Sequence, residues 1–214
     1  PNRALAERLV GLAGPNFDQA FIVSGGSEAT EAALKLARQY TVAIGAPERW
    51  KVLSRMPSYH GASLGAVSVT GDPDSEAMFA PIARMMPKIP APMTYRLPDN
   101  HDADSYARHC AQALEAAILT EGPGTVLAFI MEPVGGLSTG ATVAPGHYMK
   151  AVRDICTRHG VLLIFDEVLS GAGRTGAVLA ADLWFNREPL PGMVRLSLLL
   201  LAYRCVAPRG RRED

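Results

Sequence analysis

The chain has few cysteines and no long apolar run. Its three cysteines, Cys110, Cys156 and Cys205, lie far apart, and no Cys-X-X-Cys pair or histidine at ligand spacing accompanies them. We therefore expect no metal site, and a reducing cytoplasm as the compartment. Apolar stretches such as residues 198–202 are far shorter than the ~20 residues that cross a bilayer. No membrane span is expected.

Neither sign of charge is in excess. Lys plus Arg and Asp plus Glu each number 21 among 214 residues. A balanced chain has no overall basic field, so we expect no nucleic-acid partner. With 48% hydrophobic residues the chain can bury a substantial core, which indicates a soluble globular protein. It starts at Pro1 rather than Met, and we expect either a processed protein or a piece of a longer one.

The chain has few lysines, and none lies after residue 150. The lysines are Lys35, Lys51, Lys88 and Lys150. None of them has a glycine before it, so the Gly-Lys-Ser/Thr loop of nucleotide hydrolases is absent. This absence excludes a nucleotide hydrolase in which the acidic pair Asp166-Glu167 holds magnesium.

Apolar runs bounded by turn residues alternate with amphipathic stretches, which predicts repeated βα units, a mainly parallel sheet and helices on both faces. Strands are expected at residues 20–23, 51–55, 126–131 and 161–165. Helices are expected after Ser27, at 62–69, at 104–119 and at 146–158. Residues 71–100 are rich in Pro and Met, and we interpret them as a long ordered excursion without a clear period.

The character of the chain changes near residue 190. Residues 190–214 are rich in Leu and Arg and have neither strand alternation nor a convincing helix start. We therefore expect this tail not to continue the sheet. The predicted division is a larger unit at 1–189 and an atypical tail at 190–214.

The turn Ser24-Gly25-Gly26-Ser27 lies between a predicted strand and a predicted helix. Its backbone N–H groups and the Ser27 hydroxyl can converge on an anion at the positive end of the helix, which makes a phosphate cradle. A tight turn with a capping serine is an equally good interpretation of this segment alone.

Asp166 follows the apolar strand 161–165, at the carboxyl edge where open α/β sheets bind ligands. A carboxylate fixed there can accept a hydrogen bond from a protonated ring nitrogen. Side chains alternate along a strand, so Glu167 should point to the opposite side. The alternative is that both acids cap the next turn or face solvent.

Two further candidates lie at strand ends. Tyr59 in Tyr59-His60-Gly61 could stack on a planar cofactor, although a lone Tyr or His is more often structural. His60 lacks an accompanying Ser or Cys in a nucleophile elbow, so we assign it no general-base role. Glu132 ends the strand before Pro133 and lines the same edge, or it is a solvent-exposed loop acid.

Together these segments resemble the class III, ω-type aminotransferases, enzymes that use pyridoxal 5′-phosphate (PLP) on the aspartate-aminotransferase fold. The segments, in chain order, are Ser24–Ala29 with Ala32–Arg38 behind it, Tyr59–Gly61, Glu132–Gly136, Phe165–Val168 and Gly173–Gly176. Each is weak alone, but five in the right order and spacing are specific. The resemblance implies that residues 1–189 are a partial large PLP-binding domain.

The resemblance also implies roles. Gly26 and Ser27 would bind the cofactor phosphate, Tyr59 and Val168 would cover the two faces of the pyridine ring, and Asp166 would pair with its nitrogen. Glu132 would lie on the substrate side. The implied enzyme is a cytoplasmic homodimer that transfers an amino group from an amine or amino acid to a keto acid.

The family's Schiff-base lysine follows the strand-end aspartate by about thirty residues, and here that region holds Arg195 and no lysine. Arginine cannot replace it, because its guanidinium stays protonated. We therefore assign no catalytic residue and expect an inactive fragment whose tail is translated out of register. The alternatives are a non-catalytic PLP-binding or partner-binding remnant, and an aminomutase or decarboxylase on the same fold.

Overall fold

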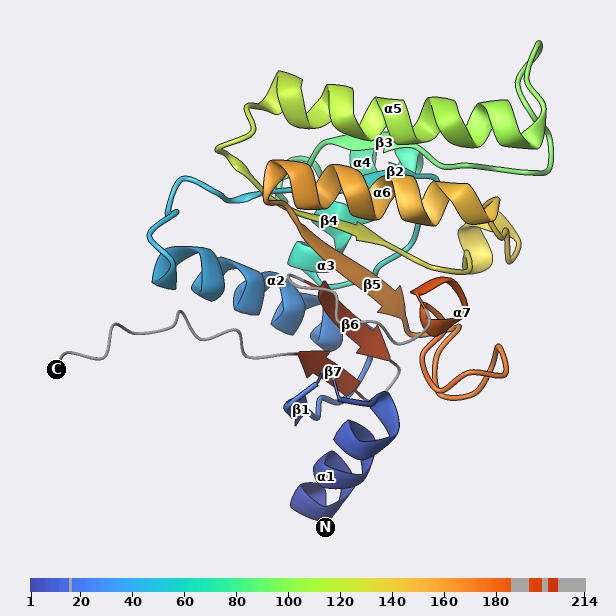
Figure 1. Ribbon diagram of the computed structural model, residues 1–214. Helices are drawn as coiled ribbons and strands as arrows, with labels where there is room; N and C mark the ends of the chain where they lie inside the picture. The colour runs from blue at the N-terminus through green and yellow to red at the C-terminus, as the bar shows by residue number, and fades with distance from the viewer. Residues whose placement is uncertain (16, 186–192, 198–199, 204–214) are drawn as a thin grey trace, which may run out of the picture.

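The structure, a computed structural model, describes residues 1–15, 17–185, 193–197 and 200–203, the last two segments as backbone. In these residues seven strands form one sheet in the order β1-β7-β6-β5-β4-β2-β3 (Figure 1). The strands are β1 (Gln19–Phe21), β2 (Lys51–Met56), β3 (Lys88–Pro90), β4 (Val126–Met131), β5 (Leu162–Glu167), β6 (Met193–Ser197) and β7 (Leu200–Tyr203). The run from β6 to β3 is parallel, whereas β7 is antiparallel to both β6 and β1.

Helices cover both faces of the sheet, which confirms the predicted α/β architecture. They are α1 (Asn2–Ala13), α2 (Gly26–Ala43), α3 (Leu64–Val69), α4 (Pro73–Phe79), α5 (Ala103–Glu121), α6 (Gly146–His159) and α7 (Asp182–Phe185), with a 3₁₀ turn, η1, at Leu137–Thr139. Figure 1 shows α5 and α6 lying together over one face and α2 over the other. None of the helices in the described part of the chain is long and apolar enough to span a membrane.

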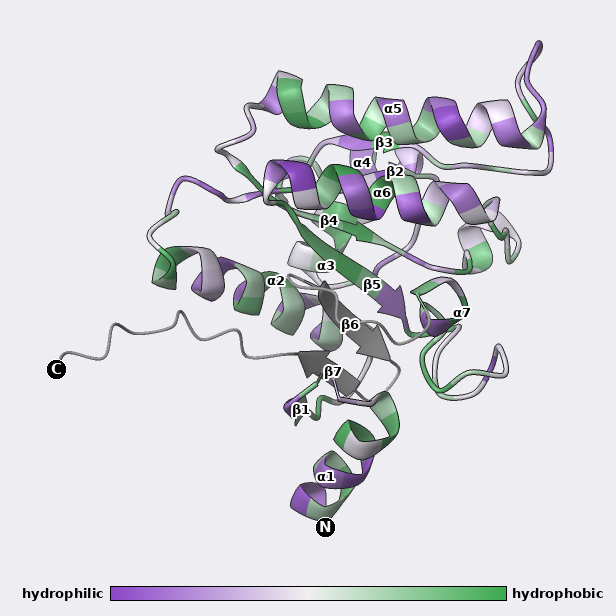
Figure 2. Cartoon of the chain, viewed as in Figure 1, coloured by the Kyte–Doolittle hydropathy of each residue, from purple (hydrophilic) through white to green (hydrophobic). Residues whose placement is uncertain are grey.

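The two central strands are buried along their whole length. Every residue of β4 and β5 is buried, as expected for parallel strands covered on both faces. Phe129 and Leu163 pack toward α5 and α6, whereas Ile130 and Ile164 pack toward α2. Figure 2 shows the hydrophobic body of β5 and its hydrophilic carboxyl end. The acidic pair is therefore fixed at the edge of a rigid core.

Residues 71–100 contain more regular structure than the sequence predicts. Asp72 caps α4 by accepting a hydrogen bond from the Ser75 backbone N–H, and Pro73 occupies the first helical turn. The strand β3 pairs parallel with β2 at the edge of the sheet. It is only three residues long, and so short a strand leaves no readable period.

The prediction that the tail does not continue the sheet is wrong. The strand β6 pairs parallel with β5, from Leu163 opposite Met193 to Glu167 opposite Ser197. The strand β7 then links β6 to β1. Backbone pairing does not require an alternating sequence, so the absence of alternation was a poor guide.

Candidate active site

One pocket of about 240 Å³ lies where the carboxyl ends of β4 and β5 meet the amino end of α2 and the segment after β2. All six residues proposed from the sequence as binding or substrate-side residues line it. They are Gly26, Ser27, Tyr59, Glu132, Asp166 and Val168. The remaining lining residues are His60, Gly61, Val134 and Leu169. The fold thus brings four separate sequence segments into one cavity.

The amino end of α2 opens onto this pocket. Its N-cap is Gly25, and no side chain of the described residues caps the helix. Ser27 therefore is not the cap; its Oγ accepts the Ala62 backbone N–H at 2.9 Å. A hydroxyl that accepts one hydrogen bond still has its own proton to donate. The helix end and the Ser27 hydroxyl thus form a donor set suited to an anion.

Two glycines keep this part of the pocket open. A Cβ on Gly26 would lie 3.1 Å from Val168 Cγ1. A Cβ on Gly61 would lie 2.6 Å from Ser27 Oγ, and Gly61 has a φ of +132°. Side chains at these two positions would press on Val168 and Ser27, so the cradle depends on glycine at both.

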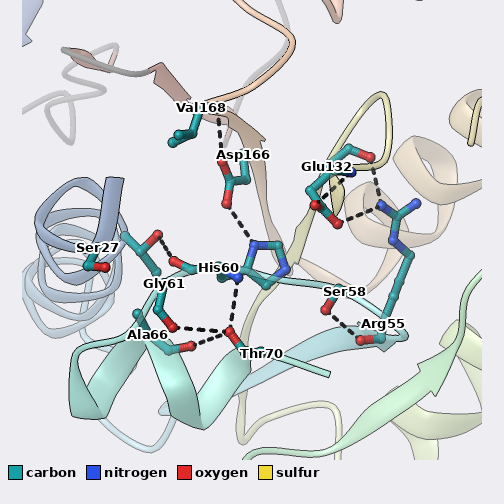
Figure 3. Close-up of polar contacts among 12 residues, drawn as sticks. Ser27, Arg55, Ser58, His60, Gly61, Ala66, Thr70, Glu132, Asp166 and Val168 are labelled. Atoms are coloured by element: carbon teal, nitrogen blue, oxygen red, sulfur yellow. Dashed lines mark hydrogen bonds and ion pairs between the residues drawn. The ribbon is translucent and has the colours of Figure 1, made fainter. Parts of the chain in front are cut away.

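Asp166 is held by His60. The Nδ1 atom of His60 lies 2.8 Å from Asp166 Oδ2, and both residues are buried, with exposed fractions of 2% and 5% (Figure 3). The other carboxylate oxygen, Oδ1, accepts the Val168 backbone N–H at 3.1 Å. With Asp166 ionised, His60 Nδ1 is the donor. The pair fixes the orientation of both side chains at the wall of the pocket.

Two threonines hold the His60 backbone from opposite sides. Thr30 Oγ1, from α2, donates to the His60 carbonyl at 2.8 Å. The His60 N–H donates to Thr70 Oγ1 at 2.9 Å, and Thr70 Oγ1 in turn donates to the Ala66 carbonyl at 3.0 Å (Figure 3). Both threonines are buried. The imidazole position is therefore set by α2 and α3 together.

Glu132 is buried beside Arg55 of β2. Arg55 Nη2 donates to the Glu132 backbone carbonyl at 2.7 Å and lies 3.7 Å from Oε2 (Figure 3). Glu132 Oε1 accepts the Gly136 N–H at 3.0 Å. Burial raises the pKa of Glu132, and the charges of His60 and Arg55 oppose that rise only in part. Glu132 is thus a buried acid on the pocket wall, not a solvent-exposed loop acid.

Glu167 faces away from this site, as strand alternation predicts. Its Oε2 and Oε1 accept the backbone N–H groups of Ala180 at 2.6 Å and Ala181 at 3.0 Å. Two charge-assisted bonds to the segment before α7 make Glu167 a structural residue. Adjacent acids on one strand therefore serve opposite sides of the sheet.

Tyr59 and Val168 supply the less polar surface of the pocket. Tyr59 is 53% exposed, so its ring is accessible from the cavity. Among the described residues, no group of three or more His, Cys, Asp or Glu side chains could hold a metal ion. The arrangement suits a planar organic molecule whose anionic group lies at the amino end of α2. The other end of that molecule would present a hydrogen-bond donor to the Asp166 carboxyl group.

Sequence reasoning did not single out His60 and Arg55 as site residues. His60 lies within the Tyr59–Gly61 segment, but nothing in the sequence around it indicates a partner on β5. Arg55 lies near the carboxyl end of β2, and only the folded sheet brings it to Glu132. The Tyr59–Gly61 turn was the one signal for His60, and no comparable signal exists for Arg55.

Comparison with known proteins agrees with this geometry. The Aminotransferase class-III family model matches residues 1–196. A probable aminotransferase of Mycobacterium tuberculosis is 40% identical over 182 residues, which is 85% of this chain and 39% of that protein. A diaminobutyrate–2-oxoglutarate transaminase of Halomonas elongata is 39% identical over 181 residues, which is 83% of this chain and 38% of that protein. The chain thus spans about two fifths of the length of these curated relatives.

Solved structures show the same fold. A PLP-bound amine transaminase from an uncultivated Pseudomonas species matches with a TM-score of 0.85 and 35% identity, over 95% of this chain and 47% of that one. An (S)-enantioselective ω-transaminase from Thermomicrobium roseum matches with a TM-score of 0.85 and 33% identity, over 96% of this chain and 47% of that one. On the family match, the relatives and the fold, this chain belongs to the class III aminotransferases.

Proposed function

We propose that this chain is the cofactor-binding part of a PLP-dependent aminotransferase, which transfers an amino group from an amine or amino acid to a keto acid. The observation that carries the proposal is the single pocket shared by the α2 amino end, Asp166, Tyr59 and Glu132. The PLP bound to the similar Pseudomonas amine transaminase supports the choice of cofactor.

The residues of the pocket fit PLP from end to end. The α2 amino end, with Gly26 and the Ser27 hydroxyl, would hold the phosphate. Tyr59 and Val168 would cover the two ring faces, and a buried carboxylate at Asp166 would hold the protonated ring nitrogen. Bound PLP supplies an electron sink that weakens a bond at the Cα atom of the substrate.

The chain's own residues prepare that chemistry through Asp166 and His60. His60 Nδ1 lies 2.8 Å from Asp166 Oδ2 and fixes the orientation of that carboxyl group at the wall of the pocket. Asp166 would accept a hydrogen bond from the ring nitrogen of bound PLP and would help to keep that nitrogen protonated. Thr30 and Thr70 hold His60 in place for this task. Glu132, on the substrate side, would attract the ammonium group of an incoming amine.

The absent Schiff-base lysine limits what this chain does alone. No lysine follows Asp166, so we expect no transaminase turnover by the chain as it stands. A non-catalytic PLP-binding or partner-binding remnant is the alternative, as is an aminomutase or decarboxylase on the same fold. Reversible PLP binding without borohydride trapping on a lysine supports the remnant, whereas sustained turnover overturns the inactive-fragment proposal.

The test is a PLP titration of the purified chain, followed by the absorbance of the cofactor. We expect saturable binding that Asp166→Asn weakens by about tenfold or more, since a charge-assisted hydrogen bond is lost. Asp154→Asn, an exposed change on α6, should leave the affinity unchanged. The proposal fails if the chain does not bind PLP saturably, or if Asp166→Asn binds it as well as the unchanged chain.

The same proposal extends to organisation and location. Residues 1–189 would be a partial large PLP-binding domain, and residues 190–214 would be encoded out of register. The apolar tail can still pair as β6 and β7, because ladder hydrogen bonds come from the backbone. The intact enzyme would be a homodimer in the cytoplasm. Sequencing the DNA that encodes residues 176–214 tests the frame: another frame containing a lysine supports the proposal, and no such frame contradicts it.

A further inference from the structure

Arg55 is a buried cation that lies outside the proposed PLP pocket. It is 4% exposed and is not one of the described residues that line that cavity. In the strand β2 it follows Leu53 by two positions, so its side chain leaves the sheet on the same face as that core residue. In the described part of the chain, Glu132 is the one acid within ion-pair distance of it. An effect of Arg55 on the pocket is therefore exerted through Glu132.

The core does not require a guanidinium at this position. Burial of a cation costs free energy of desolvation, and an apolar pair in place of a buried ion pair is often equally stable. The fully buried side chains of Cys110 and Tyr148 lie within range of the Arg55 charge and offer it no acid. The Nε atom of Arg55 has no hydrogen-bond partner among the described residues. The contacts with Glu132 are therefore the main compensation for burying this charge.

Arg55 holds Glu132 at two points. Its Nη2 atom donates to the Glu132 main-chain carbonyl at 2.7 Å, past the last paired residues of β2 and β4, and lies 3.7 Å from Oε2 (Figure 3). The Gly136 N–H donates to the other carboxyl oxygen, Oε1, at 3.0 Å. The backbone and both carboxyl oxygens of Glu132 thus each have a contact, which fixes the orientation of the carboxyl group at the pocket wall.

The charges around Glu132 differ in sign and position. Burial raises the pKa of Glu132, His60 and Arg55 oppose that rise, and Asp166 adds to it. His60 and Asp166 form their own pair on the pocket wall, with 2.8 Å between Nδ1 and Oδ2, whereas Arg55 acts from outside the pocket. Loss of the Arg55 cation would leave a buried acid that ionises only at higher pH. A neutral Glu132 would attract an ammonium group far less than a carboxylate does.

We propose that Arg55 is a positioning residue for amino transfer, which holds the Glu132 carboxylate in the orientation that meets the ammonium group of the amino donor. The inference rests on the proposed function. Arg55 touches neither the donor nor the cofactor and acts through Glu132. Its removal should therefore abolish recognition of the ammonium group while leaving the phosphate and ring contacts of PLP intact.

Two cofactor analogues test this assignment without requiring turnover. Pyridoxamine 5′-phosphate carries an ammonium group, and 4′-deoxypyridoxine 5′-phosphate lacks only that amino group. Equilibrium titrations from pH 4.5 upward give the ratio of their affinities, in which titration of the shared phosphate cancels. We expect the unchanged chain to prefer the amine, and the preference to grow as Glu132 ionises. Arg55→Gln should lower the ratio at neutral pH by about tenfold and move the midpoint of its pH profile upward, with the affinity for the deoxy analogue unchanged.

Further variants separate positioning from support of the fold. Arg55→Lys keeps the cation and should restore part of the ratio. Glu132→Gln should give a low ratio that does not change with pH, and adding Arg55→Gln to it should lower the ratio no further. Arg8→Gln, the same change at an exposed position of α1, is the matched control and should keep the full ratio. If Arg55→Gln does not fold, Arg55→Met takes its place, because an apolar side chain needs no buried partner.

An equal loss of affinity for both analogues in the Arg55 variants overturns the proposal, as does failure of both Arg55→Gln and Arg55→Met to fold, because Arg55 is then a structural residue. A ratio that survives Arg55→Gln overturns it too, and so does an Arg55→Gln effect that persists at full size beside Glu132→Gln. Equal affinities of the two analogues for the unchanged chain overturn the positioning role alone, since the binding of the cofactor then stands. If PLP and both analogues fail to bind, the proposed function fails and the positioning role with it.

Discussion

Asp166 and Glu167 are adjacent, ionisable and buried, yet their carboxylates have different partners. Asp166 meets a histidine at the pocket, whereas Glu167 meets two backbone N–H groups on the other side of the sheet. The alternation of strand side chains separates binding from structural support within two residues. Substitution at each position should therefore change a different measured property.

Glu167→Ala should destabilise the fold strongly. It leaves the buried N–H groups of Ala180 and Ala181 without their acceptor, which costs about 2 kcal/mol or more in the free energy of unfolding. Urea denaturation measures this cost. Glu48→Ala, an exposed change in the loop after α2, should stay within about 0.5 kcal/mol. Similar losses for the two variants would remove the structural role assigned to Glu167.

Glu132 should make stability depend on pH. Burial raises the pKa of its carboxyl above the ordinary value of 4.5, so the folded state binds the proton more tightly than the unfolded state. The resulting stabilisation is full below pH 4.5 and is lost as pH rises through the folded-state pKa. Glu132→Gln does not titrate and should lack this loss.

The measurement is the free energy of unfolding of both proteins from pH 4.5 upward. The stability of the unchanged chain should fall relative to that of Glu132→Gln, by at most about 1.4 kcal/mol per pH unit. A difference that is constant across this range, or that grows in favour of the unchanged chain, would contradict the raised pKa of Glu132.

Residue-level prediction has its best basis where a motif contains its own spacing. Gly26, Ser27, Asp166 and Val168 lie in segments whose order and intervals resemble one family, and all four line one pocket. Arg55 could not be found in this way. Its partner, Glu132, comes from another strand, and the contact exists only after the sheet has formed.

At the scale of elements, the turn before α3 packs closely against the first turn of α2. Ser27 accepts the Ala62 N–H, and Glu31 Oε1 accepts both the Ser63 hydroxyl at 2.7 Å and the Gly65 N–H at 2.8 Å. The proposed phosphate cradle therefore depends on the contact between α2 and the segment that leads into α3. A substitution in the turn before α3 should therefore displace the Ser27 side chain.

Gly61→Ala should disturb this contact. The added Cβ would lie 2.9 Å from the Ser27 Cα atom, and the φ of +132° disfavours a side chain. We expect a loss of about 1–3 kcal/mol in the free energy of unfolding together with weaker PLP binding. Gly45→Ala is the control, because its φ is +78° but its Cβ would meet nothing within 4 Å. Equal losses in the two variants would show backbone strain alone.

The central elements were predictable because their signals are strong. Residues 126–131 are continuously apolar, and the observed strand β4 has those bounds. The edge elements α4 and β3 were not predicted, since a seven-residue helix and a three-residue strand give too few turns or alternations to read. Their positions depend on β2 and on the cap at Asp72, not on their own periodicity.

At the scale of the whole molecule, exposed apolar side chains line the proposed PLP pocket and the adjoining cavity between the loop after β4 and the segment after β5. Leu137, Leu169 and Tyr59 line them and are more than half exposed. A contiguous exposed apolar surface of this kind is typical of a contact region. The chain should therefore associate with itself and be poorly soluble.

Sedimentation velocity over a range of protein concentrations measures this association. Leu137→Ser should shift the distribution toward the monomer, because it replaces a 93% exposed leucine beside the pocket. Met78→Ser on α4, where the methionine is 69% exposed but lines neither pocket, should have little effect. A monodisperse, cooperatively unfolding monomer at all concentrations would contradict the prediction.

The overall architecture followed from the alternation of strands and helices, but the limits of the sheet did not. A parallel sheet with helices on both faces is the arrangement that buries continuous apolar strands such as β5. The extension through β6 and β7 was missed, because the Leu-rich sequence there lacks the period on which strand prediction depends.

The contact between Gly26 and Val168 has a consequence for how this family can vary. A Cβ at position 26 would lie 3.1 Å from Val168 Cγ1, although the two residues are 142 positions apart in the chain (168 − 26). An alanine at 26 requires the Val168 side chain to move by a few tenths of an ångström, and a smaller residue at 168 would remove this requirement. The two positions should therefore change together in evolution, and the double substitution should be tolerated better than the sum of the single ones.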